Sequence, residues 1–153
     1  MSLFLGIDVG TSGCRSCVID AAGNIQAESR TLLPGPVRNG STIEQDPALW
    51  WSALAETLDA LTAQVPMAAI EAIGLDGTSS TLLCCDSAGT PLAPALMYND
   101  ARAVAAAQRI VACSPHDSAA HGASSSLAKL LWLLDTPAGK SATYALHQAD
   151  WLL

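Results

Sequence analysis

Two motifs combine an aspartate with glycine and hydroxyl side chains, a combination typical of phosphate- and metal-binding turns. The first is GIDVGTSG, with Asp8, and the second is GLDGTSST, with Asp76. Each aspartate ends an apolar run, and Gly-Thr-Ser lies just after it. The glycines let the backbone approach a phosphate or sugar closely. The Thr and Ser hydroxyls and the backbone N–H groups can bind anionic oxygens. The aspartate can bind Mg²⁺, which takes oxygen ligands. The repetition favours a ligand site, although an Asx turn in a hairpin also explains one copy. For Asp76, a role that only supports its loop stays open beside a functional one.

A third motif, YNDAR at residues 98–102, joins the end of an extended segment to a helical pattern. Asn99, Asp100 and Arg102 offer hydrogen-bond acceptors and donors together, which suits several neighbouring hydroxyl groups. A structural alternative stays open, in which Asp100 caps the helix and Arg102 lies on its solvated face.

Other nucleotide and metal motifs are missing from the sequence. It contains neither a Walker A loop nor G-x-G-x-x-G, so a nucleotide site would be of the strand–turn–strand kind. Cys14 and Cys17 form C-x-x-C, but positions three apart in a strand point to opposite faces. We expect the cysteines to be small core residues. The three histidines show no metal-ligand spacing.

Composition narrows the class of protein. Half of the 153 residues are apolar, 14% are charged, and the net charge is -7, which indicates a folded domain with a sizeable core. Scattered basic residues argue against nucleic acid as a partner. No apolar run is long enough for a membrane span, and the N-terminus has no signal-peptide pattern. We therefore expect a cytoplasmic protein that binds no membrane.

The motifs must be positioned by an α/β fold with a mixed sheet. Asp46 suits the N-cap and Pro47 the first position of a helix that ends before Pro66. Residues 34–45 are expected to form a loop, and Lys129 to reach the surface of an apolar helix. The remaining predicted elements are strands at 3–8, 14–20, 25–33, 70–75 and 81–85, an extended segment at 93–98, helices at 101–112 and 125–134, and a strand followed by a helix start at the end. That ending predicts the N-terminal piece of a longer protein.

Five ordered motifs resemble the amino-terminal domain of FGGY carbohydrate kinases, and most closely the pentulose kinases, the xylulokinase and D-ribulokinase-like members. The resemblance covers nearly the whole chain. The motifs are GIDVGTSGCRSCVID, EQDPALWW, IGLDGTSSTLLCCDSAGTPLAPALMYNDARA, ASSSLAKLLWL and HQADWLL.

The resemblance implies an actin-like ATPase (ribonuclease H-like) fold, with a mixed sheet and helices on both faces. Residues 1–153 would be the sugar-binding domain, and a second, ATP-binding domain would lie outside this chain. Asp8 would organise Mg²⁺ near the phosphates of ATP. The expected phosphate-facing turn consists of Thr11, Ser12 and Gly13, and the expected sugar-binding residues are Ser79, Ser80, Asn99, Asp100 and Arg102.

The expected reaction transfers the γ-phosphate of ATP to a hydroxyl of a ketopentose, D-xylulose or D-ribulose. Typical xylulokinases carry Gln-Met-His where this chain has Thr78, Ser79 and Ser80, a change that resembles the D-ribulokinase-like branch. The catalytic base of the family is expected downstream, so the isolated piece should be inactive. Alternatives are a non-catalytic sugar- or nucleotide-binding module, or another sugar kinase such as glycerol kinase. A homodimer is left open.

Overall fold

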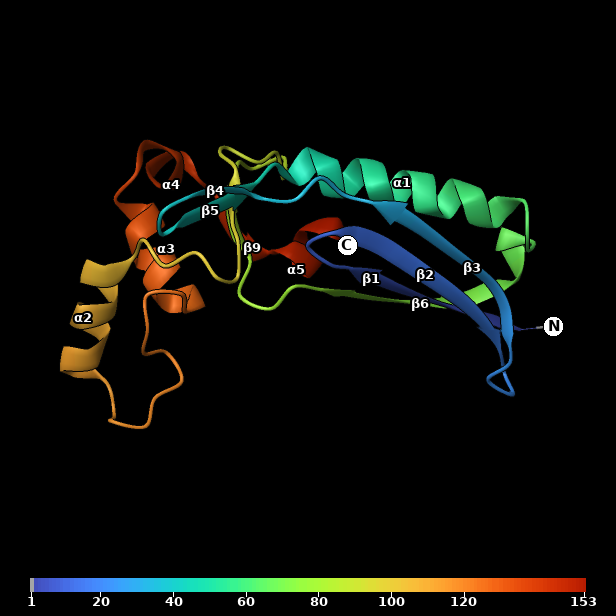
Figure 1. The fold of residues 1–153 in the computed structure, drawn as a ribbon, viewed down its shortest axis with the longest axis horizontal. Helices are drawn as coiled ribbons and strands as arrows, with labels where there is room; N and C mark the ends of the chain where they lie inside the picture. The colour runs from blue at the N-terminus through green and yellow to red at the C-terminus, as the bar shows by residue number, and fades with distance from the viewer. Residues whose placement is uncertain (1) are drawn as a thin grey trace. The chain divides into compact units, whose positions relative to one another are not determined.

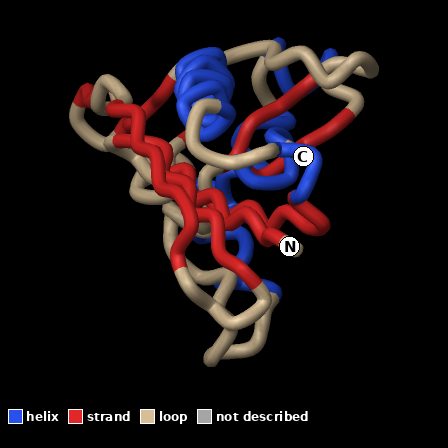
Figure 2. The backbone as a smooth tube through the Cα atoms, turned by 90° about the vertical axis from the view of Figure 1, so that its right-hand side faces the viewer, coloured by secondary structure: helices blue, strands red, loops and turns tan. Residues whose placement is uncertain are grey.

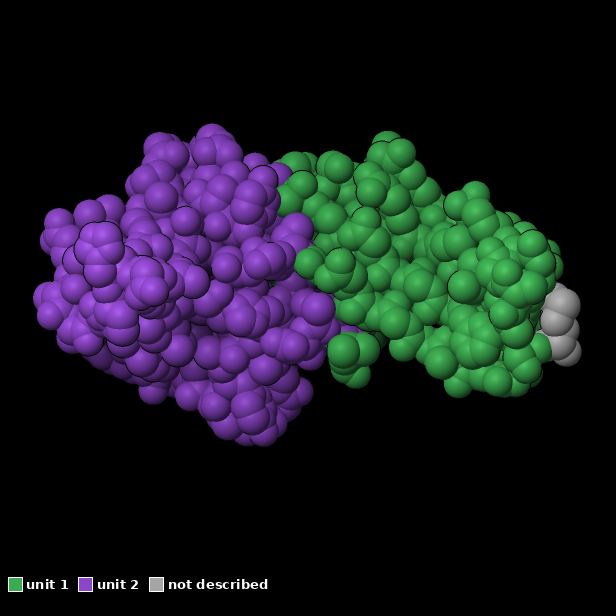
Figure 3. Space-filling view, turned by 90° about the horizontal axis from the view of Figure 1, so that it is seen from below, with its two compact units in different colours: residues 1–35, 48–77, 153 green, residues 36–47, 78–152 purple. Residues whose placement is uncertain are grey.

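The computed structural model describes residues 2–153, which divide into two compact units (Figure 3). Among the described residues, unit 1 comprises 2–35, 48–77 and 153, and unit 2 comprises 36–47 and 78–152. Each unit has its own sheet, whereas the sequence analysis predicted a single sheet for the whole chain. The α/β class and the mixed character of the first sheet are confirmed.

Unit 1 contains a four-stranded sheet in the order β3-β2-β1-β6. The predicted meander is confirmed as β1 (Leu3–Val9), β2 (Gly13–Asp20) and β3 (Ile25–Leu32), joined in antiparallel fashion. The fourth strand, β6 (Ile70–Gly77), pairs in parallel with β1. This parallel pairing brings the carboxyl ends of β1 and β6 to the same edge of the sheet.

Helix α1 (Pro47–Thr62) lies along one face of this sheet (Figures 1 and 2). Apolar residues alternate along β1, and its buried set is Leu3, Leu5, Ile7 and Val9. The helix contributes Trp50, which is fully buried, and it ends before Pro66 as predicted. The short 3-10 helix η1 (Met67–Ala69) then leads into β6. The opposite sheet face, which carries Gly6 and Asp8, is exposed in the described chain.

Unit 2 contains a five-stranded antiparallel sheet in the order β4-β5-β8-β7-β9. Its strands are β4 (Val37–Asn39), β5 (Thr42–Gln45), β7 (Leu82–Cys85), β8 (Ala95–Leu96) and β9 (Tyr144–His147). The prediction of a loop at 34–45 is wrong, because β4 and β5 form a hairpin there. Gly40 supplies the positive φ of 59° that the tight turn requires.

Four helices complete unit 2. They are α2 (Val104–Cys113), α3 (Ser126–Leu134), α4 (Pro137–Ser141) and α5 (Gln148–Leu152). The N-cap of α2 is Ala103, so Asp100 does not cap this helix as the sequence suggested. Ser125 caps α3 by accepting the Ala128 N–H. Within residues 2–153, no helix is long and apolar enough to cross a bilayer.

The cysteines follow the expected core pattern in part. Cys14 is buried on the α1 side of the sheet and Cys17 is half-buried on the other side, which confirms that the C-x-x-C pair is split. Burial raises the pKa of the Cys14 thiol. A raised pKa disfavours the thiolate that redox or metal chemistry needs. Cys113, on α2, is exposed and departs from the prediction.

Candidate functional site

Asp8 and Asp76 occupy neighbouring positions on adjacent strands of unit 1. The two residues are partners in the parallel pairing of β1 and β6, and both are exposed. Adjacent strands lie about 4.8 Å apart, and paired residues of a parallel sheet project from the same face. The two motifs therefore meet at one edge of the sheet, an adjacency that the sequence analysis did not predict.

This pair of aspartates fits Mg²⁺. The described residues hold no cluster of three or more His, Cys, Asp or Glu side chains around a metal site. Mg²⁺ is commonly bound by one or two carboxylates while water and phosphate oxygens complete its octahedron. Asp8 and Asp76 supply that number of carboxylates on an exposed edge.

Arg15 is a neighbour of Asp8 that the sequence analysis missed. Its Nη1 lies 3.2 Å from Asp8 Oδ2, and the two side chains are 57% and 51% exposed. The antiparallel register of β1 and β2 pairs the two positions directly. Counting outward from the glycine turn would have found this pair. An exposed ion pair adds less than about 1 kcal/mol to stability, so Arg15 is better placed to offer positive charge beside the turn than to hold the fold.

The turn between β1 and β2 is tight. The Gly10 N–H donates to the Gly13 carbonyl at 3.0 Å, and the Ser12 carbonyl accepts the Leu33 N–H at 3.0 Å. A Cβ atom on Gly13 would lie 2.8 Å from the Thr31 carbonyl oxygen. Gly13 therefore has a packing role between β2 and β3, which does not depend on whether it also binds phosphate. Phosphate contacts from Thr11, Ser12 and Gly13 stay a prediction.

Replacing Gly13 by alanine is expected to destabilise the protein by about 1–3 kcal/mol, because the new methyl group forces β2 and β3 apart. Gly74→Ala is the matched control, since the Cβ of residue 74 on β6 would meet nothing within 4 Å. Chemical unfolding followed by circular dichroism measures both variants. Equal stability of the two would contradict the packing role.

Unit 2 contains a polar cavity of about 320 Å³ in which both predicted serines, Ser79 and Ser80, take part. Its other lining residues are Tyr98, Ala119, His121, Ser124 and Ser125. Sequence reasoning did not select these others. Two features of the sequence could have indicated them, namely the run of serines at 124–126 and the tyrosine at the start of YNDAR. Several hydroxyl groups around one cavity suit a ligand with many hydroxyl groups of its own.

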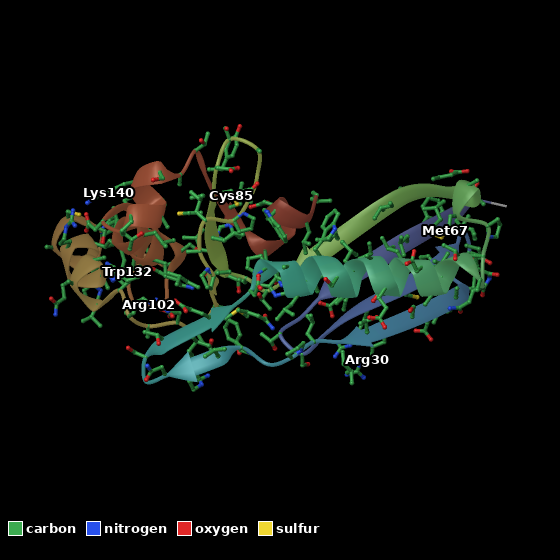
Figure 4. All side chains as sticks on the ribbon, turned by 90° about the horizontal axis from the view of Figure 1, so that it is seen from above. Arg30, Met67, Cys85, Arg102, Trp132 and Lys140 are labelled. Carbon is green, nitrogen blue, oxygen red and sulfur yellow. The ribbon has the colours of Figure 1, made fainter. Side chains whose placement is uncertain are left out.

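Asp100 and Arg102 form a buried ionic network in unit 2. Asp100 is fully buried, and its Oδ2 accepts the Ile43 N–H at 2.6 Å and Arg102 Nη2 at 2.7 Å. Arg102 also donates to Glu44 at 2.7 Å and stacks over Trp132, 4.9 Å from the ring centroid (Figure 4). Burial acts to lower the pKa of Arg102, but its bonds to Asp100 and Glu44 outweigh this and raise it.

This network changes how YNDAR is understood. The oxygens of Asp100 are engaged by backbone and by Arg102, so these two side chains brace the segment that carries Tyr98 and Asn99. Asn99 Oδ1 is buried and has no hydrogen-bond partner among the described residues. Such an atom is costly unless something fills its hydrogen bond. A sugar contact from Asn99, Asp100 or Arg102 stays a prediction.

The expectation that Lys129 reaches the surface is wrong. The side chain starts on α3 and is fully buried. Its ammonium donates to backbone carbonyls, which satisfies a charged group that an apolar helix alone could not accommodate.

The fold and the sequence are similar to those of known carbohydrate kinases. A kinase from Brucella ovis described as a xyloylose kinase superposes with a TM-score of 0.88 at 29% identity, over 98% of this chain and 33% of that one. Xylulose kinase from Streptomyces coelicolor is 34% identical over 110 residues, 71% of this chain and 22% of its own length. Glycerol kinase from Aromatoleum aromaticum is 31% identical over 93% of this chain and 30% of its own.

These similarities define the class as carbohydrate kinases of the actin-like ATPase fold. Residues 3–147 match the N-terminal domain of the FGGY family of carbohydrate kinases, and the chain belongs to that family. It spans between about a fifth and a third of the length of the relatives it matches.

Proposed function

We propose that this chain is the amino-terminal, sugar-binding part of an ATP-dependent kinase that phosphorylates a ketopentose, D-xylulose or D-ribulose. The observation that carries the proposal is the pair Asp8 and Asp76, brought together beside a Gly-Thr-Ser turn in a member of a sugar-kinase family. A second domain, outside this chain, would supply the adenosine site and the base.

The residues of unit 1 would act on the phosphate side of the reaction. Asp8 and Asp76 would hold Mg²⁺, which, when bound, neutralises charge on the transferring phosphoryl group. The N–H and hydroxyl groups of Thr11–Gly13 would face the phosphate oxygens. Arg15 would add positive charge next to Asp8. Phosphoryl transfer asks a protein mainly for such positioning and charge stabilisation.

The residues of unit 2 would orient the sugar. Ser79, Ser80 and Tyr98 line the cavity directly, while Asp100 and Arg102 hold the segment that carries Tyr98. Fixed hydrogen-bond donors and acceptors distinguish hydroxyl positions, because an unmatched polar group in the site loses its partner.

Glycerol kinase is the second candidate, because glycerol kinases are also among the relatives at 31–32% identity. The pentulose proposal is supported by the xylulose kinases at 34% identity and by the motif order. A cytoplasmic location stays a prediction, and a homodimer stays open.

The test is a coupled ATP-consumption assay of the full-length protein with D-ribulose, D-xylulose, L-ribulose and glycerol. We expect a pentulose to give the highest kcat/KM and residues 1–153 alone to show no turnover. The highest kcat/KM with glycerol would favour the second candidate. ATP consumption with none of the four compounds would count against the proposal.

Removing the hydroxyl of Ser79 or of Ser80 is expected to raise the KM for the sugar about fivefold in each variant, the equivalent of one hydrogen bond of ~1 kcal/mol. Ser87→Ala, in an exposed turn, is the control. Steady-state kinetics with varied sugar at saturating ATP gives the comparison. An unchanged KM in both alanine variants would remove the serines from the sugar site.

A further inference from the structure

We propose that Lys129 is a positioning residue of the sugar site, which joins the turn carrying Ser80 to the segment carrying Tyr98. Its Nζ donates to the Ser80 carbonyl at 2.5 Å, to the Met97 carbonyl at 2.9 Å and to the Tyr98 carbonyl at 3.4 Å. The two segments are far apart in sequence, and both end at the same cavity. This inference rests on the proposed function.

The ammonium is matched to its surroundings. It has three donors and meets three carbonyl acceptors, so burial leaves none of its hydrogen bonds unmade. Uncharged side chains could not donate to all three oxygens at once. Burial lowers the pKa of Lys129 to about 8, and the nearby carboxylate of Asp100 acts in the opposite direction.

Ser80 needs external support, because its backbone is in the left-handed region with φ of 60°. That conformation is unfavourable for a residue other than glycine and persists only where surrounding contacts hold it. Lys129 holds the carbonyl of Ser80. The Ser126 hydroxyl, at the first turn of α3, donates to Ser80 Oγ at 3.2 Å and pairs with His147 Nε2 at 2.9 Å.

The second segment is tied to the same turn. The Tyr98 N–H donates to Thr81 Oγ1 at 3.1 Å, while the carbonyls of Met97 and Tyr98 face Lys129. Lys129 itself is absent from the cavity lining. It therefore acts on a ligand only through Ser80 and Tyr98, which is the behaviour of a positioning residue and not of a catalytic one.

The first test is Lys129→Met in the full-length protein. Methionine keeps the length of the side chain but donates nothing, so Ser80 and Tyr98 lose their common anchor. We expect the KM for the preferred sugar, and its Kd by calorimetry without ATP, to rise at least tenfold. The KM for ATP should stay within about twofold. Lys140→Met is the matched control, since Lys140 is exposed on α4 (Figure 4).

The second test uses the wild-type protein and does not depend on how a variant folds. Raising the pH through the pKa of Lys129, about 8, removes one donor from the cluster. The sugar Kd should rise above this pH, and a flat profile would overturn the proposal. Asp100 is the charged neighbour of Lys129. The other charged or titratable groups on the segments and elements near it are Arg102 and Glu44 of the ionic network, Cys84 on β7, the phenol of Tyr98, and His121 and His147.

The Lys129→Met variant assigns the pH effect among these groups. We expect this variant to bind the sugar weakly, with a Kd that does not change between pH 7 and pH 9. An alkaline rise that persists in the variant would belong to another group and overturn the assignment, as would a sugar Kd equal to that of the wild type. If the wild type binds a sugar without phosphorylating it, the proposed function fails, and the ratio of the two Kd values still decides the role of Lys129.

Discussion

Asp8→Ala in the full-length protein is expected to lower kcat about 1,000-fold while the sugar Kd changes less than threefold. The carboxylate lies at the end of β1, beside Asp76 and the Gly-Thr-Ser turn, on the proposed phosphate side. Loss of a metal-binding carboxylate removes several kcal/mol of charge stabilisation from the transferring group, and each ~1.4 kcal/mol is a factor of ten in rate. Steady-state kinetics and calorimetry with sugar provide the two readouts.

Glu28→Gln is the matched control for Asp8→Ala. Glu28 is an exposed carboxylate on β3 that lines the same sheet face as Asp8. Removing the Glu28 charge changes the electrostatic field at this sheet face but leaves the end of β1 intact. The kcat should therefore stay within about twofold. Near-normal turnover of Asp8→Ala would refute the metal role. An equal loss in both variants would show that general charge on this face matters instead.

Asp100→Ala is expected to destabilise the protein by about 3–5 kcal/mol, because removing one member of a buried ion pair leaves the other charge without compensation. Arg102, only 12% exposed at its side chain, would lose its main partner, and the Ile43 N–H would lose its acceptor. Urea unfolding monitored by tryptophan fluorescence measures the change.

Glu44→Gln serves as the control for Asp100→Ala, since Glu44 pairs with the same guanidinium but is 37% exposed. Pairs open to solvent are worth less than about 1 kcal/mol. Equal losses in the two variants would mean that burial of Asp100 contributes nothing special. A loss below 1 kcal/mol for Asp100→Ala would show that YNDAR is not braced by this network, and direct sugar contact by Asp100 would gain support.

Local patterns in the sequence were enough to predict much of unit 1. The meander of β1 to β3 and the start of α1 follow from apolar alternation and from Asp46-Pro47, signals that depend on near neighbours. The two aspartates were recognised as similar, but their adjacency depends on the parallel pairing of β1 with β6, which the order of elements alone does not specify.

Unit 2 was harder to predict because its key contacts join distant segments. The hairpin of β4 and β5 was hidden by Pro34, Pro36 and two glycines, which usually mark loops. Lys129 was placed at the surface because a lysine in an apolar helix usually extends to solvent. Its hydrogen-bond acceptors are the backbone carbonyls of Ser80, Met97 and Tyr98. Every residue has a backbone carbonyl, so the sequence pattern could not indicate these acceptors.

The parallel pairing of β1 with β6 has a consequence for how the protein folds. The meander closes through short turns, whereas β6 can pair with β1 only after α1 and the intervening chain have formed a long loop. Contacts between distant segments form late, because loop closure costs entropy before the pairing rewards it. We therefore expect Asp76 to reach Asp8 only after the meander has formed. A nascent or misfolded chain would contain every residue of the proposed metal site and still be unable to assemble it.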